Sequence, residues 1–173
     1  MAGAIFQILA ALAFGPPQTT ASWALVSDNN NGVVTYTFRV NAATSVTGKQ
    51  IRATFVASNS GALVCTHASV GTTATAPSTV ATPKEFLFSG VSGFSLSAGQ
   101  SITSDWLNFD VNSGDHVTID MDLTTTNVRQ LGSATGADTY FKASVTDYAT
   151  ATVSGYSTSL NTATSISSIE VRK

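Results

Sequence analysis

Charged residues are scarce in this sequence. Of its 173 residues only 10% are Asp, Glu, Lys or Arg, and the formal net charge is −2, whereas soluble globular domains usually contain about 25% charged residues. Proteins that bind nucleic acid or an anionic membrane usually gather positive charge on one face. The composition therefore argues against both function classes, and we expect no nucleic-acid partner.

Cysteine and histidine are nearly absent. Cys65 is the single cysteine, which excludes an internal disulfide framework and a cysteine-based zinc site. We expect a buried, inert thiol there, with an intersubunit disulfide as the alternative. His67 and His116, the two histidines, lie in or beside predicted strands, where structural or surface histidines are far commoner than catalytic ones. Because the G-x-S-x-G, Walker, H-E-x-x-H and C-x-x-C motifs are also missing, we expect no enzyme and no cofactor.

One apolar run opens the chain, over residues 2–14, interrupted only by Gln7 and ended by Gly15-Pro16-Pro17. It is shorter than the roughly 20 residues of a membrane-spanning helix, and it lacks the basic start of a signal peptide. Such a peptide is expected to be buried, either in its own domain or in a neighbouring subunit. We therefore divide the chain into an apolar arm, 1–20, and a domain, 21–173. The expected contact residues of the arm are Ile5, Phe6, Ile8, Leu9, Leu12 and Phe14.

What the sequence does have is the alternation of β-strands. Hydrophobic residues make up 43% of the chain, and Ser and Thr together number 48. In His116–Leu123, for example, the apolar residues 117, 119, 121 and 123 share one face, while Asp120 and Asp122 share the other and are expected to face solvent. Many short strands separated by turn residues indicate an all-β antiparallel sandwich or jelly roll. The other expected strands are 33–40, 51–57, 62–70, 85–88, 100–104, 139–146, 151–156 and 165–172.

Loops are predicted between these strands. The Asn- and Gly-rich segments 29–32, 59–61, 97–99 and 112–115 are typical of tight turns. Two longer stretches, 71–83 and 127–136, are expected to be surface loops. Mobility is the default interpretation of such loops, and contact with a partner or ligand is the alternative.

Five aspartates fall between residues 105 and 122. Asp120 and Asp122 are two positions apart on one strand, so their carboxylates are expected about 7 Å apart on one face. With loop carbonyls they could hold a calcium ion. Solvated strand faces and turn-capping aspartates are the favoured interpretation, and we predict no metal site.

Aromatic residues offer a second kind of site. Flat sugar faces stack on aromatic rings while acidic and amide groups bind the hydroxyls. Trp106 and Tyr140, with Asp105 beside Trp106, are therefore candidates for a glycan-binding surface. Core packing is the alternative for these rings.

The segment Gly99–Leu123 (GQSITSDWLNFDVNSGDHVTIDMDL) resembles a known family. Its Ala98-Gly99 turn, Ser104-Asp105 strand start and Gly114-Asp115 turn are similar to those of the N-terminal β-sandwich that precedes the catalytic domain in some GDSL-type (SGNH) esterases. The resemblance extends over roughly residues 33–172, through Ile51-Arg52, Ser58–Gly61 and Ser168–Val171. It implies a non-catalytic accessory sandwich, because the family's Gly-Asp-Ser block has no counterpart here and no catalytic residue is carried over.

Two function classes follow from these features. The first is a structural subunit of a larger assembly, of the kind found in a bacteriophage or phage-like particle as a decoration, spike or tail-fibre component. Its arm would dock into neighbouring subunits, and it would lie on the surface of a virion or other extracellular particle. The second is a carbohydrate-binding module that uses loop aromatics and aspartates to bind a cell-surface glycan.

Overall fold

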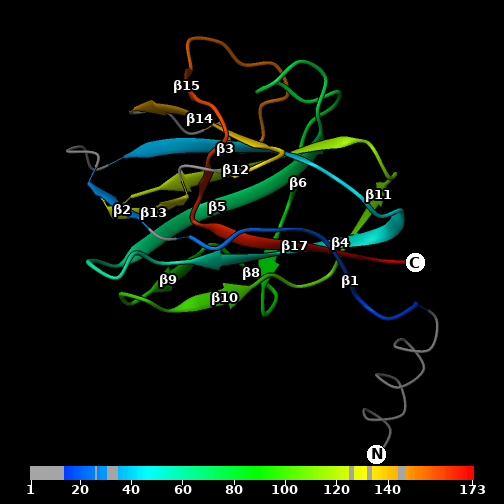
Figure 1. Ribbon diagram of the computed structural model, residues 1–173, viewed down its shortest axis with the longest axis horizontal. Coiled ribbons are helices and arrows are strands. Elements are labelled where there is room, and N and C mark those ends of the chain that lie inside the picture. The colour runs from blue at the N-terminus through cyan, green and yellow to red at the C-terminus, as the bar shows by residue number, and fades with distance from the viewer. Residues whose placement is uncertain (1–13, 26, 31–34, 125–126, 132–133, 144–146) are drawn as a thin grey trace, which may run out of the picture.

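The computed structural model describes residues 14–25, 27–30, 35–124, 127–131, 134–143 and 147–173. Within these ranges strands are the only regular secondary structure, which confirms the all-β prediction. Two large antiparallel sheets face each other across a common core (Figure 1). The fold is therefore sandwich-like, as the alternating segments predicted.

The first sheet has five strands, in the order β1-β17-β4-β10, with β11 also paired to β4. Its strands are β1 (Gln18–Ser22), β17 (Ile166–Arg172), β4 (Gly48–Val56), β10 (Ser101–Thr103) and β11 (Leu107–Val111). β10 and β11 follow one another along one side of β4, and β17 lies along its other side. Because β1 begins at Gln18, residues 18–20 of the expected arm are part of this sheet.

The second sheet has seven strands, in the order β15-β14-β3-β12-β5-β6, with β9 also paired to β5. Its strands are β15 (Ser157–Ser159), β14 (Ala137–Ala143), β3 (Tyr36–Ala43), β12 (His116–Leu123), β5 (Leu63–Thr72), β6 (Lys84–Glu85) and β9 (Phe94–Leu96). β12 has the bounds that its alternation predicted.

Two smaller sheets complete the described fold. One consists of β16 (Ala163–Thr164), β13 (Asn127–Leu131) and β2 (Ser27–Asn30), and the other is the hairpin of β7 (Leu87–Phe88) and β8 (Val91–Ser92). The loop predicted over 127–136 was therefore wrong in its first half. β13 escaped prediction because, among its side chains that the structure describes, Val128 alone is in the core. The strand predicted over 151–156 was also wrong, since the strand there starts at Ser157.

The core lies between the two large sheets. Phe55 of β4 is fully buried, and its ring centroid lies 5.2–6.2 Å from those of three other phenylalanines, 86, 88 and 94. Cys65 is a free thiol, 2% exposed, as expected, and burial raises its pKa well above the usual value. The apolar faces of the central strands supply most of the remaining core: Phe38, Val40, Ile51, Ala53, Ile119, Met121, Leu123, Ile169 and Val171.

Candidate functional site

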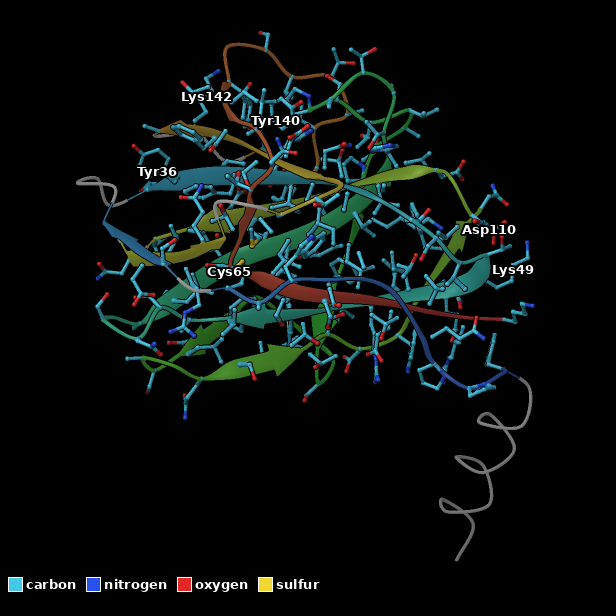
Figure 2. All side chains as sticks on the ribbon, viewed as in Figure 1. Tyr36, Lys49, Cys65, Asp110, Tyr140 and Lys142 are labelled. Atoms are coloured by element: carbon cyan, nitrogen blue, oxygen red, sulfur yellow. The ribbon has the colours of Figure 1, made fainter. Side chains whose placement is uncertain are left out.

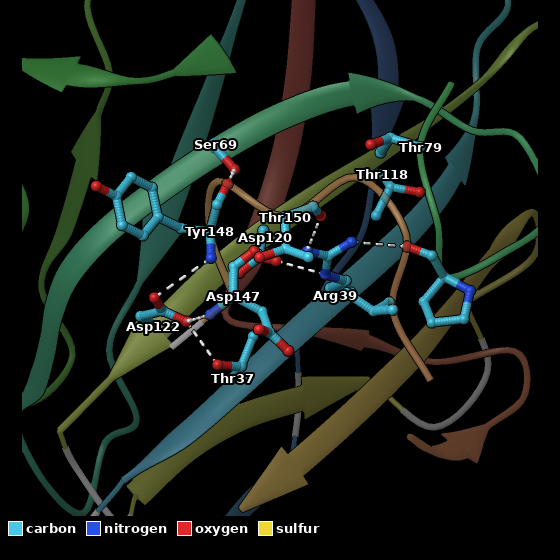
Figure 3. A network of polar contacts seen from close by, with 12 residues as sticks. Thr37, Arg39, Ser69, Thr79, Thr118, Asp120, Asp122, Asp147, Tyr148 and Thr150 are labelled. Carbon is cyan, nitrogen blue, oxygen red and sulfur yellow. Dashed lines mark hydrogen bonds and ion pairs between the residues drawn. The ribbon is translucent and has the colours of Figure 1, made fainter. Parts of the chain in front are cut away.

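The outer face of the seven-stranded sheet carries polar side chains that are covered rather than solvated. Thr118, Asp120 and Asp122 of β12 are each 1% exposed, and Arg39 of the adjacent β3 is 0% exposed. The expectation that the two aspartates face solvent was therefore wrong. Two irregular segments cover this face: residues 147–156, here called the strap, and residues 73–80, here called the Pro77 loop (Figure 3).

Arg39 and Asp120 form a buried ion pair at the centre of this face. They are directly opposite each other in the β3–β12 register, and Arg39 Nε lies 2.5 Å from Asp120 Oδ2. Neither Asp120 oxygen accepts a well-aligned hydrogen bond from any described residue. Burial therefore raises the pKa of the Asp120 carboxyl well above its usual range, and the Arg39 guanidinium opposes that rise.

The rest of the Arg39 guanidinium holds both covering segments. NH2 donates to the carbonyl oxygens of Asp147 and Thr150 in the strap, each at 2.6 Å, and NH1 donates to the Pro77 carbonyl at 3.1 Å. The two segments also contact each other, because the Thr79 N–H donates to the Ala151 carbonyl at 2.9 Å. One arginine thus joins a strand to two loops that are far apart in sequence, an arrangement suited to its forked donor geometry.

Asp122 fixes the start of the strap. Its Oδ1 accepts hydrogen bonds from Thr37 Oγ1 at 2.5 Å and from the Asp147 N–H at 3.2 Å, and its Oδ2 accepts one from the Tyr148 N–H at 3.4 Å. Burial raises the pKa of this carboxyl, while the three hydrogen bonds lower it. Of the two aspartates considered as calcium ligands, Asp122 is thus engaged by hydrogen-bond donors and Asp120 by the Arg39 ion pair.

His67 of β5 anchors the strap from the other side. Its ring stacks on that of Tyr148 with centroids 4.0 Å apart and an interplanar angle of 8°, and its Nδ1 lies 2.7 Å from Glu85 Oε1. The neighbouring Ser69 is buried, and its hydroxyl donates to the Tyr148 carbonyl at 2.5 Å. Serine, histidine and glutamate therefore lie together here, and each of them contacts the strap or a neighbouring strand.

The residues predicted to bind a glycan do not lie together. Tyr140 is opposite Arg39 in the β14–β3 register, so it belongs to the outer face of the seven-stranded sheet. Trp106 lies on the outer face of the other sheet, where its ring is 4.5 Å from Arg52 Cζ and 4.3 Å from Arg172 Cζ. Asp105 caps the β7–β8 turn by accepting from the N–H groups of Ser89 and Gly90. The three residues thus do not form one platform.

Of the predicted arm contacts, the structure describes Phe14. Its ring lies 4.8 Å from Arg172 Cζ, and the next residue, Gly15, donates its N–H to the carbonyl of Lys173 at 2.9 Å. Ile5, Phe6, Ile8, Leu9 and Leu12 lie outside the described residues.

Near this end of the sandwich, two adjoining hollows of about 370 and 250 Å³ lie between β11 and the β5–β6 side of the other sheet. They share Thr72, Lys84 and Phe109. Lys49, Asn108 and Asp110 line the larger hollow, and Gly71, Val80, Ala81 and Thr82 line the smaller. We call the two together the Phe109 groove.

Sequence reasoning missed Arg39, the strap and this groove. In the alternating sequence of its strand, Arg39 lies on the polar face. That pattern does not distinguish a polar side chain that is exposed to solvent from one that other segments cover. The Pro77 loop fell within the predicted 71–83 loop, for which mobility was the default interpretation and contact with a partner or ligand the alternative.

Within the described ranges, no group of three or more His, Cys, Asp or Glu side chains is placed to hold a metal ion. In the same part of the chain, no helix has the length and apolarity needed to cross a bilayer. No protein-family model matches the sequence, and no curated protein matches it at a significant level.

Proposed function

We propose that this chain is a non-enzymatic structural subunit of a larger assembly and that it docks onto neighbouring subunits through its apolar arm. The observation that carries the proposal is the anchoring of Phe14 and Gly15 beside the chain's last residues. The apolar residues that precede them in the sequence are therefore joined to a fixed point at one end of the sandwich, which suits an arm that docks onto a neighbouring subunit.

The outer face of the seven-stranded sheet supports the same proposal. Its charged and nucleophilic groups, Arg39, Asp120, Asp122 and Ser69, are engaged in holding the strap and the Pro77 loop. Because these polar groups hold the domain's own loops on the sheet, the domain is expected to be rigid, as a structural component of a particle should be. We extend the proposal to a decoration, spike or tail-fibre subunit of a phage-like particle, supported by the low charge and the Ser- and Thr-rich composition.

The test is the solution mass of two purified chains by light scattering. One is the full chain, and the other begins with Met followed directly by Phe14, so that the contacts of Phe14 and Gly15 are kept. We expect a defined oligomer for the full chain and a monomer of similar thermal stability for the shortened one. A full chain that is monomeric, or a shortened chain that keeps the oligomeric mass, overturns the proposal.

A second variant separates specific docking from non-specific adhesion of an apolar peptide. In the full chain Ile8→Asp with Leu9→Asp leaves the length unchanged and places two charges in the arm. We expect the same fall to monomer. A broad distribution of masses in the full chain, rather than a closed oligomer, also counts against the proposal.

A further inference from the structure

The Phe109 groove has an apolar half. The hollow of about 250 Å³ is lined mostly by apolar atoms, and its lining residues include Val80, Ala81 and Phe109. A protein cavity of about 150 Å³ holds a benzene ring, so this hollow has room for a phenylalanine or leucine side chain with part of a neighbour. Val80, at its rim, is 69% exposed, the most exposed large apolar residue described.

The wall that carries Val80 is held firmly in place. The Val80 N–H donates to the Thr72 carbonyl at 2.9 Å, and the preceding Thr79 N–H donates to the Ala151 carbonyl of the strap at 2.9 Å. Arg39 holds the Pro77 carbonyl of the same loop. Because these hydrogen bonds hold the loop, the exposed surface around Val80 has its shape before a partner binds. Such preorganisation lowers the entropic cost of binding.

The groove lies close to the arm's point of attachment. Arg172, which packs against Phe14, donates from Nε to Gln50 Oε1 at 2.7 Å, and Gln50 Nε2 donates to Asn108 Oδ1 at 2.5 Å. Asn108 precedes Phe109 and lines the groove. Figure 2 shows Lys49 and Asp110, which line its charged half, at the end of the sandwich where Figure 1 places the C-terminus.

The arm joins the described domain at this end. β1 runs antiparallel to β17, and the Gly15–Lys173 hydrogen bond continues that pairing to the last residue. Gly15 therefore lies beside the end of β17. Residues 2–13 contain no charged side chain, and the 13 residues that precede Phe14 would span up to about 43 Å if fully extended. A segment of that length, attached at this end of the sandwich, is long enough to reach a neighbouring copy.

We propose that the apolar half of the Phe109 groove receives the apolar arm of a second copy of this chain. The inference rests on the proposed function and adds the receptor surface: an uncharged, Ile- and Leu-containing segment matches a hollow lined by Val80, Ala81 and Phe109. Each copy would give its arm to one neighbour and receive the arm of another, a head-to-tail contact that closes into a ring of defined mass.

The first test is Val80→Asp in the full chain. We expect the oligomeric mass measured by light scattering to fall to that of the 17.8 kDa monomer. Leu160→Asp is the matched control, because Leu160 is 67% exposed and follows β15, at the opposite edge of the seven-stranded sheet from β6. It should keep the oligomer. If both variants or neither dissociate, the inference is overturned.

A crosslinking test separates exchange between copies from docking within one chain. A Leu9→Cys chain is mixed with a Val80→Cys chain and oxidised, with Leu9→Cys plus Leu160→Cys as the control pair. Disulfide-linked dimers that contain one chain of each kind should form with Val80→Cys and not with Leu160→Cys. Absence of such dimers, or equal yields in both mixtures, overturns the inference. If removal of residues 1–13 dissociates the oligomer while Val80→Asp does not, the arm functions in assembly but this groove is not its receptor.

Discussion

Arg39 and Asp120 face each other across β3 and β12 with Nε 2.5 Å from Oδ2, at a place where neither side chain reaches solvent. A buried ion pair is a weak source of net stability, because desolvation of both charges offsets their attraction. Here the arginine has a second role, since its remaining donors hold the carbonyls of Pro77, Asp147 and Thr150. The pair therefore serves mainly to fix two loops to the sheet.

Arg39→Leu should destabilise the fold by about 3–5 kcal/mol, because it leaves the Asp120 carboxyl buried without its cation and frees three carbonyl groups. The free energy of unfolding from urea titration measures this. Limited proteolysis should show new cleavage within residues 73–80 and 147–156. The double variant Arg39→Leu with Asp120→Leu should recover part of the lost stability while the cleavage persists. Recovery of protease resistance together with stability would show that the loops do not depend on Arg39.

The carboxyls of the outer face predict an unusual pH dependence. The pKa of Asp122 is raised, chiefly by burial, with Arg39, Asp120, Asp147 and His67 among the ionisable groups near it. A carboxyl whose folded pKa lies above its unfolded value of about 3.9 contributes stability below that value, and loses it as the pH rises through the folded pKa.

Asp122→Asn removes this titration. Compared with the variant, the wild-type protein should therefore lose free energy of unfolding as the pH rises from about 4 toward neutrality. Urea titrations of both proteins across that range measure the difference. Since the same background groups titrate in both, a difference that grows in favour of the wild type with rising pH would contradict the raised pKa of Asp122.

Alternation in the sequence was sufficient to place one face of β12 in the core. β12 has the predicted bounds, and its apolar side chains are in the core, because a period of two selects one face of a sheet whatever lies around it. Alternation cannot say whether the opposite face meets water. That depends on the strap, which is contributed by residues 25 or more positions away from Asp122, and whose own sequence has no regular pattern.

The predicted glycan site shows a second limit. Trp106 and Tyr140 were grouped by residue type, but strand order places them on the outer faces of different sheets. Register and sheet membership arise from long-range pairing, for which a single sequence carries little local signal. The arm stays a prediction, which rests on the nearly continuous apolar run of residues 2–14, interrupted only by Gln7.

Two glycines with positive φ offer a test of backbone packing. A Cβ on Gly93 (φ +67°) would lie 2.5 Å from the carbonyl oxygens of Cys65 and Thr66, whereas a Cβ on Gly90 (φ +83°) would meet nothing within 4 Å. Gly90→Ala should cost about 1–2 kcal/mol, the conformational penalty of a left-handed residue. Gly93→Ala should cost about 1–3 kcal/mol more, because the β9 end must move away from β5. Thermal and urea unfolding of both variants measure the difference, and equal losses would show that the close approach is not tight.

Association through an uncharged apolar arm also has a thermodynamic signature. Burial of apolar side chains contributes about 1.5–3 kcal/mol for each Leu, Ile or Phe, and near room temperature this driving force is mostly entropic. The oligomer should therefore show a negative heat-capacity change on association and weaken on cooling from 25 °C to 5 °C. Sedimentation velocity over a dilution series at both temperatures measures the dissociation constant.

The same dilution series in 0.1 M and 0.5 M NaCl measures how salt affects association. Because residues 2–14 carry no charge, raising the salt should not dissociate the oligomer. An oligomer that comes apart in 0.5 M NaCl would be held by charged groups of the domain instead of the arm, and the Lys49–Asp110 pair at the rim of the groove, 3.1 Å apart and exposed, would be the first contact to substitute.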